Sequence, residues 1–211
     1  MTGEPNMKTN NETLRLNQKR KLVGLFAGVI IVASLIAGCV VTSVYPYYQT
    51  KDVSFDSALL GKWIPADETN ASTADEFWTF EKINERTYKL TTVDNKTNHY
   101  DAVRFKWDGA TFLDCLTRER SEVQTPSHIL LRTEIVQSQL KMELLDYKWL
   151  GNLIEKNPRA IRHIIVPSQA TDEHDSGGEF TLTADTAELQ KFLLKHLKTK
   201  EAWGEPLIMK R

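Results

Sequence analysis

One short segment of the chain has the side chains that metal ions prefer, the tetrapeptide Asp172-Glu173-His174-Asp175. It runs directly into Ser176-Gly177-Gly178, a composition typical of a polar loop. Metal sites need ligands that converge in a fixed geometry with supporting hydrogen bonds behind them, and four consecutive loop residues rarely provide that. We therefore predict a solvated loop here, with no metal and no cofactor.

Nucleophilic catalysis has no recognisable pattern in the chain. Cys115 lies in an apolar, strand-like run from Thr111 to Leu116 without a local catalytic signature, so we expect a small buried hydrophobe. No histidine stands beside a serine or cysteine in a hydrolase-like pattern, and there is no glycine-rich phosphate loop. We expect no enzymatic activity.

An uncharged apolar run of 23 residues, 22–44, follows the basic triplet Lys19-Arg20-Lys21. Positive charge before such a run keeps that end in the cytoplasm, so the rest of the chain is delivered across the bilayer. One interpretation is an uncleaved signal anchor, because 23 residues at about 1.5 Å rise each are enough to span the hydrocarbon core. Export follows whether or not the run is cleaved.

The other interpretation rests on Leu35-Ile36-Ala37-Gly38-Cys39, which resembles the lipobox of bacterial lipoproteins. The resemblance implies that residues 1–38 are a signal peptide, cleaved between Gly38 and Cys39, and that the Cys39 thiol carries the lipid. Several acyl chains, at about 0.8 kcal/mol per buried methylene, anchor a protein firmly. Val40 in place of Asp after the cysteine implies the outer membrane, facing the periplasm. Cys115 then has no partner for an internal disulfide.

Composition predicts one ordinary folded domain outside the cytoplasm. Hydrophobic residues at 41% and charged residues at 26% are close to globular averages. We expect a lipidated N-terminus and tether over residues 39–57 and a single β-rich domain over 58–211. Residues 1–38 carry five basic and two acidic side chains, so the rest of the chain has a net charge of −4 out of the total of −1. Such a domain lacks the basic field that a nucleic-acid partner requires.

The first part of this domain alternates with the period of two that is typical of strands. Asp108-Gly109 favours a tight hairpin turn, since both positions of such a turn need positive φ. The result is an antiparallel meander of about six strands with short connections. The expected strands cover residues 77–80, 87–93, 101–107, 110–116, 129–136 and 140–145.

The later part mixes helices with strands. Residues 147–156 have apolar side chains at helical spacing, and Asn157-Pro158 ends the helix. The clearest helix covers 186–197, with Asp185 capping its first turn, Glu188 reaching back, and an apolar stripe through Leu189, Phe192 and Leu193. Short strands are expected at 162–167, 180–182 and 207–209. The fold class is mainly β with α, with a C-terminal helix packed on the meander.

The segment Gly61-Lys62-Trp63 resembles the glycine-x-tryptophan opening of lipocalin-like barrels. In that family the tryptophan closes one end of the barrel and a basic residue from the last strand lies over its ring. The resemblance implies that Trp63 is buried, that the first and last strands are neighbours, and that Lys210 or Arg211 is the basic partner. A cation over an indole face contributes about 0.5–2 kcal/mol.

These observations favour a lipid-anchored binding module of the cell envelope, taking a small apolar ligand or an envelope component. The alternative is a structural or protein-interaction lipoprotein whose barrel is filled by its own side chains. A hydrolase is the least favoured, because it needs a nucleophile with convergent polar groups. Cavity volume separates the first two hypotheses: at least about 300 Å³ supports a ligand.

Overall fold

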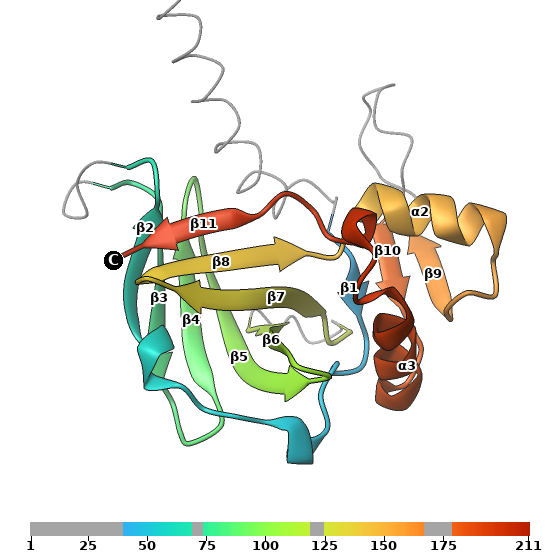
Figure 1. The fold of residues 1–211 in the computed structure, drawn as a ribbon, viewed down its shortest axis with the longest axis horizontal. Helices are drawn as coiled ribbons and strands as arrows, with labels where there is room; N and C mark the ends of the chain where they lie inside the picture. Colours follow the sequence, from blue (N-terminus) through green and yellow to red (C-terminus); the bar gives the residue numbers. More distant parts are fainter. Residues whose placement is uncertain (1–39, 69–73, 119–124, 167–178) are drawn as a thin grey trace, which may run out of the picture.

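The computed structural model describes residues 40–68, 74–118, 125–166 and 179–211. Within these ranges the protein is mainly β, a closed eight-stranded antiparallel barrel with two α-helices beside it (Figure 1). The predicted fold class is therefore confirmed. The barrel strands are β2 (Gly61–Pro65), β3 (Phe77–Lys82), β4 (Tyr88–Val93), β5 (Thr97–Trp107), β6 (Ala110–Thr117), β7 (His128–Val136), β8 (Gln139–Leu144) and β11 (Leu207–Lys210).

The last strand, β11, joins parts of the barrel that are distant from it in sequence. It pairs with β2 through Lys210 opposite Ile64 and with β8 through Leu207 opposite Met142, and the consecutive strands β6 and β7 also pair, which completes the ring. Asp108 and Gly109 join β5 to β6 with φ values of 48° and 79°, as predicted for a tight hairpin. Because every barrel strand has two neighbours, the barrel leaves no long free edge.

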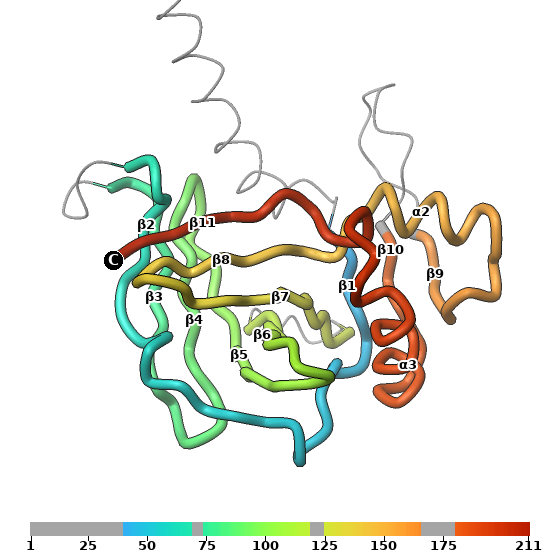
Figure 2. The backbone as a smooth tube through the Cα atoms, viewed as in Figure 1, coloured from blue at the N-terminus to red at the C-terminus, as the bar shows by residue number. Residues whose placement is uncertain are grey.

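A chain insertion between β8 and β11 forms a second layer beside the barrel (Figure 2). Its helices are followed by a short 3-10 helix, and its two strands extend the sheet. The short strand β1 (Thr42–Ser43) links this pair to the barrel, because it pairs with both β7 and β10. The inserted elements are α2 (Tyr147–Lys156), β9 (His163–Val166), β10 (Glu179–Leu182), α3 (Thr186–His196) and η3 (Lys200–Ala202).

The segment before the barrel differs from the tether expected over residues 39–57. Val41 and Tyr47 are buried in the core, and β1 is part of the sheet. Two short 3-10 helices, η1 (Thr50–Asp52) and η2 (Ser57–Leu59), lead from β1 to β2 along the barrel. Val41 and Tyr47 pack in the same apolar cluster as residues of the barrel wall and the helices, so the segment that carries them belongs to the folded domain, which does not begin at residue 58.

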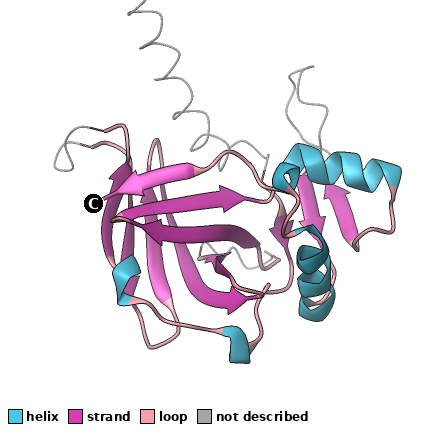
Figure 3. Ribbon diagram, in the orientation of Figure 1, coloured by secondary structure: helices cyan, strands magenta, loops and turns pink. Residues whose placement is uncertain are grey.

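Two apolar clusters form the core. The inner cluster lies inside the barrel and includes Trp63, Phe80 and Leu113. The helices lie beside the barrel (Figure 3), and the outer cluster includes residues of both, with Phe112 stacked on Phe105 and near Trp203. Inward and outward side chains alternate along each strand, so one strand supplies both clusters.

The C-terminal helix has the buried face that its sequence predicts. In α3, Leu189, Phe192 and Leu193 are all buried, and the Asp185 side chain accepts a hydrogen bond from the Glu188 backbone N–H. The Glu188 carboxylate does not complete a reciprocal cap: it pairs with Arg162 at 2.6 Å. A guanidinium within reach competes with the backbone for that carboxylate.

Candidate functional site

The end of the barrel that η2 covers is closed around Trp63. Its side chain is 0% exposed, and its indole N–H donates to the Leu59 carbonyl at 2.8 Å. Of the two basic residues expected near this ring, Arg211 is the one over it, with the guanidinium carbon 4.9 Å from the ring centroid. Lys210 instead donates to the Ala66 carbonyl at 2.9 Å.

Arg211 also holds η2 in place. Its guanidinium donates to the Ala58 carbonyl at 2.5 Å and to the Leu60 carbonyl at 3.2 Å. Gly61 follows with φ of +111°, a conformation that side-chain-bearing residues rarely adopt. Closure by Gly61, Trp63 and Arg211 therefore fixes the position of Leu59, the last residue of η2.

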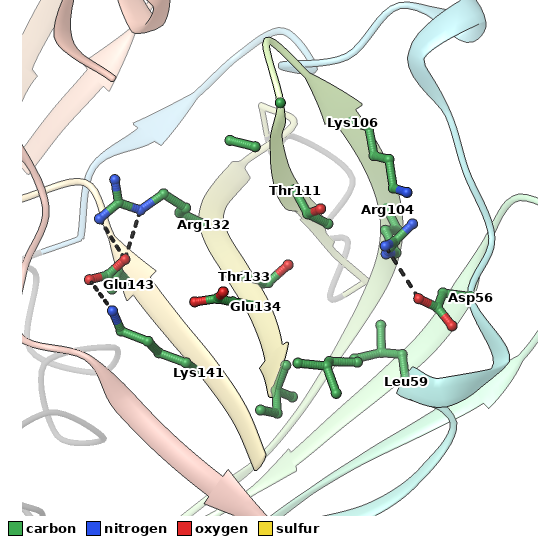
Figure 4. Close-up of a pocket in the computed structure, with 14 residues that line it drawn as sticks. Asp56, Leu59, Arg104, Lys106, Thr111, Arg132, Thr133, Glu134, Lys141 and Glu143 are labelled. Atoms are coloured by element: carbon green, nitrogen blue, oxygen red, sulfur yellow. Dashed lines mark hydrogen bonds and ion pairs between the residues drawn. The ribbon is translucent and has the colours of Figure 1, made fainter. Parts of the chain in front are cut away.

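Beside this closed end, the barrel wall opens between β6 and β7. The two strands pair from Leu116 opposite His128 to Phe112 opposite Arg132, and then separate. A cavity of about 530 Å³ occupies the opening, which we call the seam cavity (Figure 4). Strands β5 to β8 and η2 all contribute to its lining.

Strand register shows which lining side chains point into the barrel. Residues opposite each other in an antiparallel pair share a face, and Arg104 lies opposite Leu113, a member of the inner cluster. Lys106 is two residues further along the same face and lies opposite Thr111. Thr133, two residues after the inner-cluster residue Leu131, faces inward as well. The inward face near the opening is thus polar and basic.

Arg104 is neutralised at the edge of the cavity. Its guanidinium lies 3.3 Å from the Asp56 carboxylate and donates to the Ser54 hydroxyl at 2.7 Å. Asp56 also caps η2, accepting from the Ala58 backbone N–H at 3.0 Å. The pair therefore ties the cavity wall to the helix that supplies Leu59.

On the opposite side of the cavity, Arg132 and Lys141 both pair with Glu143, at 2.6 Å and 3.2 Å (Figure 4). The side chains of Lys106 and Glu134 have no ion pair or hydrogen bond with any residue in the described ranges. Glu134 follows the inward-facing Thr133, so strand alternation turns it to the outer face. Lys106 is left as an unpaired cation on the inner face.

The other half of the barrel interior is packed. A second hollow, lined by residues such as Trp78, Leu90 and Ile129, measures about 10 Å³, no more than a single water requires. Cys115 lies in its wall, and burial, followed by the nearby Asp114 carboxylate, raises the pKa of its thiol above the usual range. A protonated, buried thiol is a poor nucleophile, consistent with the prediction for this residue.

Sequence reasoning missed a buried polar cluster at the other end of β7. His128 Nδ1 lies 2.6 Å from Asp114 Oδ1, and Asp114 Oδ2 accepts from the Tyr47 backbone N–H at 2.8 Å. Both side chains of the pair are buried. The three residues come from segments far apart in sequence, so no local motif marks them.

This cluster has the residue types of a hydrolase triad without its connections. Ser43 lies opposite His128 in the β1–β7 pairing. Its hydroxyl, however, donates to the Leu182 carbonyl at 3.4 Å and accepts from the Tyr45 N–H at 3.2 Å. Ser43 is fully buried, so no substrate reaches it. The hydrogen bonds of this cluster hold β1 and the segment after it against the barrel.

Several predicted features fall outside the described residues: the lipobox with Gly38 and Cys39, and the Asp172–Asp175 loop. Within the described ranges, no three His, Cys, Asp or Glu side chains group as metal ligands. None of the helices described there has the length and apolarity to cross a bilayer.

Comparison with known proteins gives no match: no family model, no curated protein and no solved structure resembles this chain closely enough to count. A functional assignment therefore rests on the sequence and on the geometry of this structure.

Proposed function

We propose that the protein is a lipid-anchored binding module of the cell envelope, and that the seam cavity between β6 and β7 holds its small ligand. The observation that carries the proposal is the cavity volume of about 530 Å³, within the range of roughly 300–1,000 Å³ that is usual for small-molecule sites. The cavity lies on a rigid barrel, a setting that favours a preformed site.

The anchor part of the proposal is supported by the lipobox-like segment at residues 35–39 and by the short distance in sequence from Cys39 to packed residues. Val41 is buried, and β1 begins at Thr42. A lipid on Cys39 would then be attached within two residues of the packed domain. Such a short connection would keep the barrel close to the bilayer surface, which we propose to be the outer membrane on its periplasmic side.

The anchor is tested with Cys39→Ala, which should leave the precursor unprocessed and unlabelled by radioactive palmitate. Cys115→Ala is the matched control, since it removes the other cysteine of the chain and should label like the wild type. Equal labelling of Cys39→Ala and wild type would overturn the lipoprotein proposal. The uncleaved signal anchor over residues 22–44 would then take its place.

Binding in the seam cavity is tested by native mass spectrometry and extraction of the mature protein. We expect a small molecule to co-purify with the wild type and to be lost from Thr111→Trp, which fills the opening with an indole. Thr117→Trp, on the same strand but outside the cavity lining, should retain it. A co-purifying molecule that stays with Thr111→Trp would place binding elsewhere.

A protein-interaction lipoprotein is the second candidate, and one observation favours it. Ile164 and Ile165 on β9 are 51% and 50% exposed, and in the described part of the sheet β9 pairs only with β10. Exposed apolar edge strands commonly pair with other chains. Loss of a co-purifying envelope protein from Ile164→Lys, with nothing small bound to the wild type, would favour this candidate.

A further inference from the structure

Four cations and three carboxylates line the seam cavity: Arg104, Lys106, Arg132 and Lys141 against Asp56, Glu134 and Glu143. Strand register places Arg104 and Lys106 on the inner face, and Arg132, Glu134, Lys141 and Glu143 on the outer face. Each cation except Lys106 has a carboxylate partner in the described ranges. Because Glu134 faces outward, Lys106 is the inward charge that remains uncompensated.

Two hydroxyl groups lie on the same inner face. Thr111 is directly opposite Lys106 in the β5–β6 pairing, and Thr133 lines the cavity from β7 (Figure 4). Thr133 is only 8% exposed, and neither hydroxyl bonds to any side chain or backbone group that the structure describes. Both hydroxyls are therefore free to bond an oxygen that a ligand supplies.

The cavity also has an apolar side. Leu59 from η2 and Leu140 from β8 are almost fully buried, and Ile135 from β7 is partly exposed at the opening. Burial of a ligand's apolar surface against these side chains would contribute about 25 cal/mol per Å². A bare inorganic anion would not use this surface, and a neutral apolar ligand would not use Lys106.

We propose that the ligand is a small anionic amphiphile, with its charged group near Lys106, Thr111 and Thr133 and its apolar body against Leu59, Ile135 and Leu140. The inference rests on the proposed function, because it specifies what the seam cavity holds. The chemical class includes carboxylates, sulfonates and phosphate monoesters that carry a compact hydrocarbon group.

A matched pair of fluorescent probes tests the charge requirement. 1-Anilinonaphthalene-8-sulfonate is an anion, and N-phenyl-1-naphthylamine has the same ring system without the sulfonate. The wild type should bind the anion about tenfold more tightly than the neutral probe, the ratio expected when one charge-assisted contact is made. Titration followed by fluorescence gives both dissociation constants.

Variants assign the effect to Lys106. Lys106→Ala should weaken binding of the anion about tenfold and leave the neutral probe unchanged, whereas Lys106→Arg should keep the preference. Lys191→Ala, an exposed lysine on α3 far from the cavity lining, is the control and should change neither probe. Thr111→Trp should weaken both probes by filling the cavity.

The outcomes separate this inference from the function on which it rests. If Thr111→Trp weakens both probes while Lys106→Ala changes neither, the cavity binds ligands but not through this charge, and the anionic class is wrong. If Thr111→Trp changes neither probe, both the inference and the seam cavity as the binding site are overturned.

Discussion

The inward faces of β5, β6 and β7 are apolar at one end of the barrel and polar at the other. Along β6 the inward residues run from Cys115 and Leu113 to Thr111, and along β7 from Ile129 and Leu131 to Thr133. The apolar end is packed to a residual hollow of about 10 Å³, and the polar end surrounds about 530 Å³. The same alternation of inward and outward residues thus supplies a packed apolar interior at one end of these strands and a polar cavity with room for a ligand at the other.

The difference follows from how each gap between strands is covered. The β4–β5 pairing ends at Tyr88 opposite Ala102, and there the segment before η2 takes over: Val53 bridges to Phe105, and the Ser54 N–H donates to the Arg104 carbonyl at 2.9 Å. The β6–β7 gap has no such segment among the described residues. A gap between strands that another backbone segment bridges is closed as part of the barrel wall, whereas a gap without such a segment remains open as a cavity.

The largest expected loss of stability tests the packed inner cluster, with Trp63→Ala. It removes a fully buried indole from that cluster, so the free energy of unfolding should fall by about 3–5 kcal/mol. Tyr45→Ala, an exposed aromatic, should change it by about 0.5 kcal/mol or less. Urea titration of both variants measures the difference, and similar losses would mean that Trp63 is no part of the packed inner cluster.

Phe192→Ala compares the outer cluster with the inner one. The side chain is buried between α3 and its neighbours, so we expect a loss of about 3–5 kcal/mol in the free energy of unfolding. Leu194→Ala on the exposed face of the same helix is the control, with about 0.5 kcal/mol or less. A loss below about 1 kcal/mol for Phe192→Ala would show that the stripe is accessible and free to bind a partner.

Arg211→Ala tests the link between the closed end and the cavity. It removes the cation over Trp63 and two hydrogen bonds to η2, so the free energy of unfolding should fall by about 1–2 kcal/mol. Probe binding should weaken too, because η2 positions Leu59. Arg159→Ala, an exposed arginine in the turn that follows α2, should change neither quantity. Unchanged probe affinity in Arg211→Ala would break the proposed coupling.

The smallest expected effect on stability is that of Lys106→Ala. Its side chain is exposed and has no described partner, so the free energy of unfolding should stay within about 0.5 kcal/mol of the wild type. Thermal unfolding checks this value. A large destabilisation would show that Lys106 supports the wall of the barrel, and would remove the contrast between its two ends.

Much of the fold follows from local sequence. Alternation predicts the strands, Asp108-Gly109 predicts a turn, and Asp185 with Leu189 and Phe192 predicts α3, because each signal depends on residues close together in the chain. Gly61 and Trp63 of β2 also predict a long-range contact, in which a basic residue from the end of the last strand closes one end of the barrel. Arg211 and not Lys210 takes that place, since side chains alternate between the two faces of β11 and its extension.

The remaining features depend on contacts between distant segments, which no local pattern encodes. Val41 and Tyr47 look like part of a tether until β7 and β10 provide a surface for them. Asp114 and His128 meet only because β6 pairs with β7, and the seam cavity exists only because that pairing ends at Phe112 and Arg132. Register between strands is set by the packing of the whole barrel, so the position of its opening emerges with the folded structure.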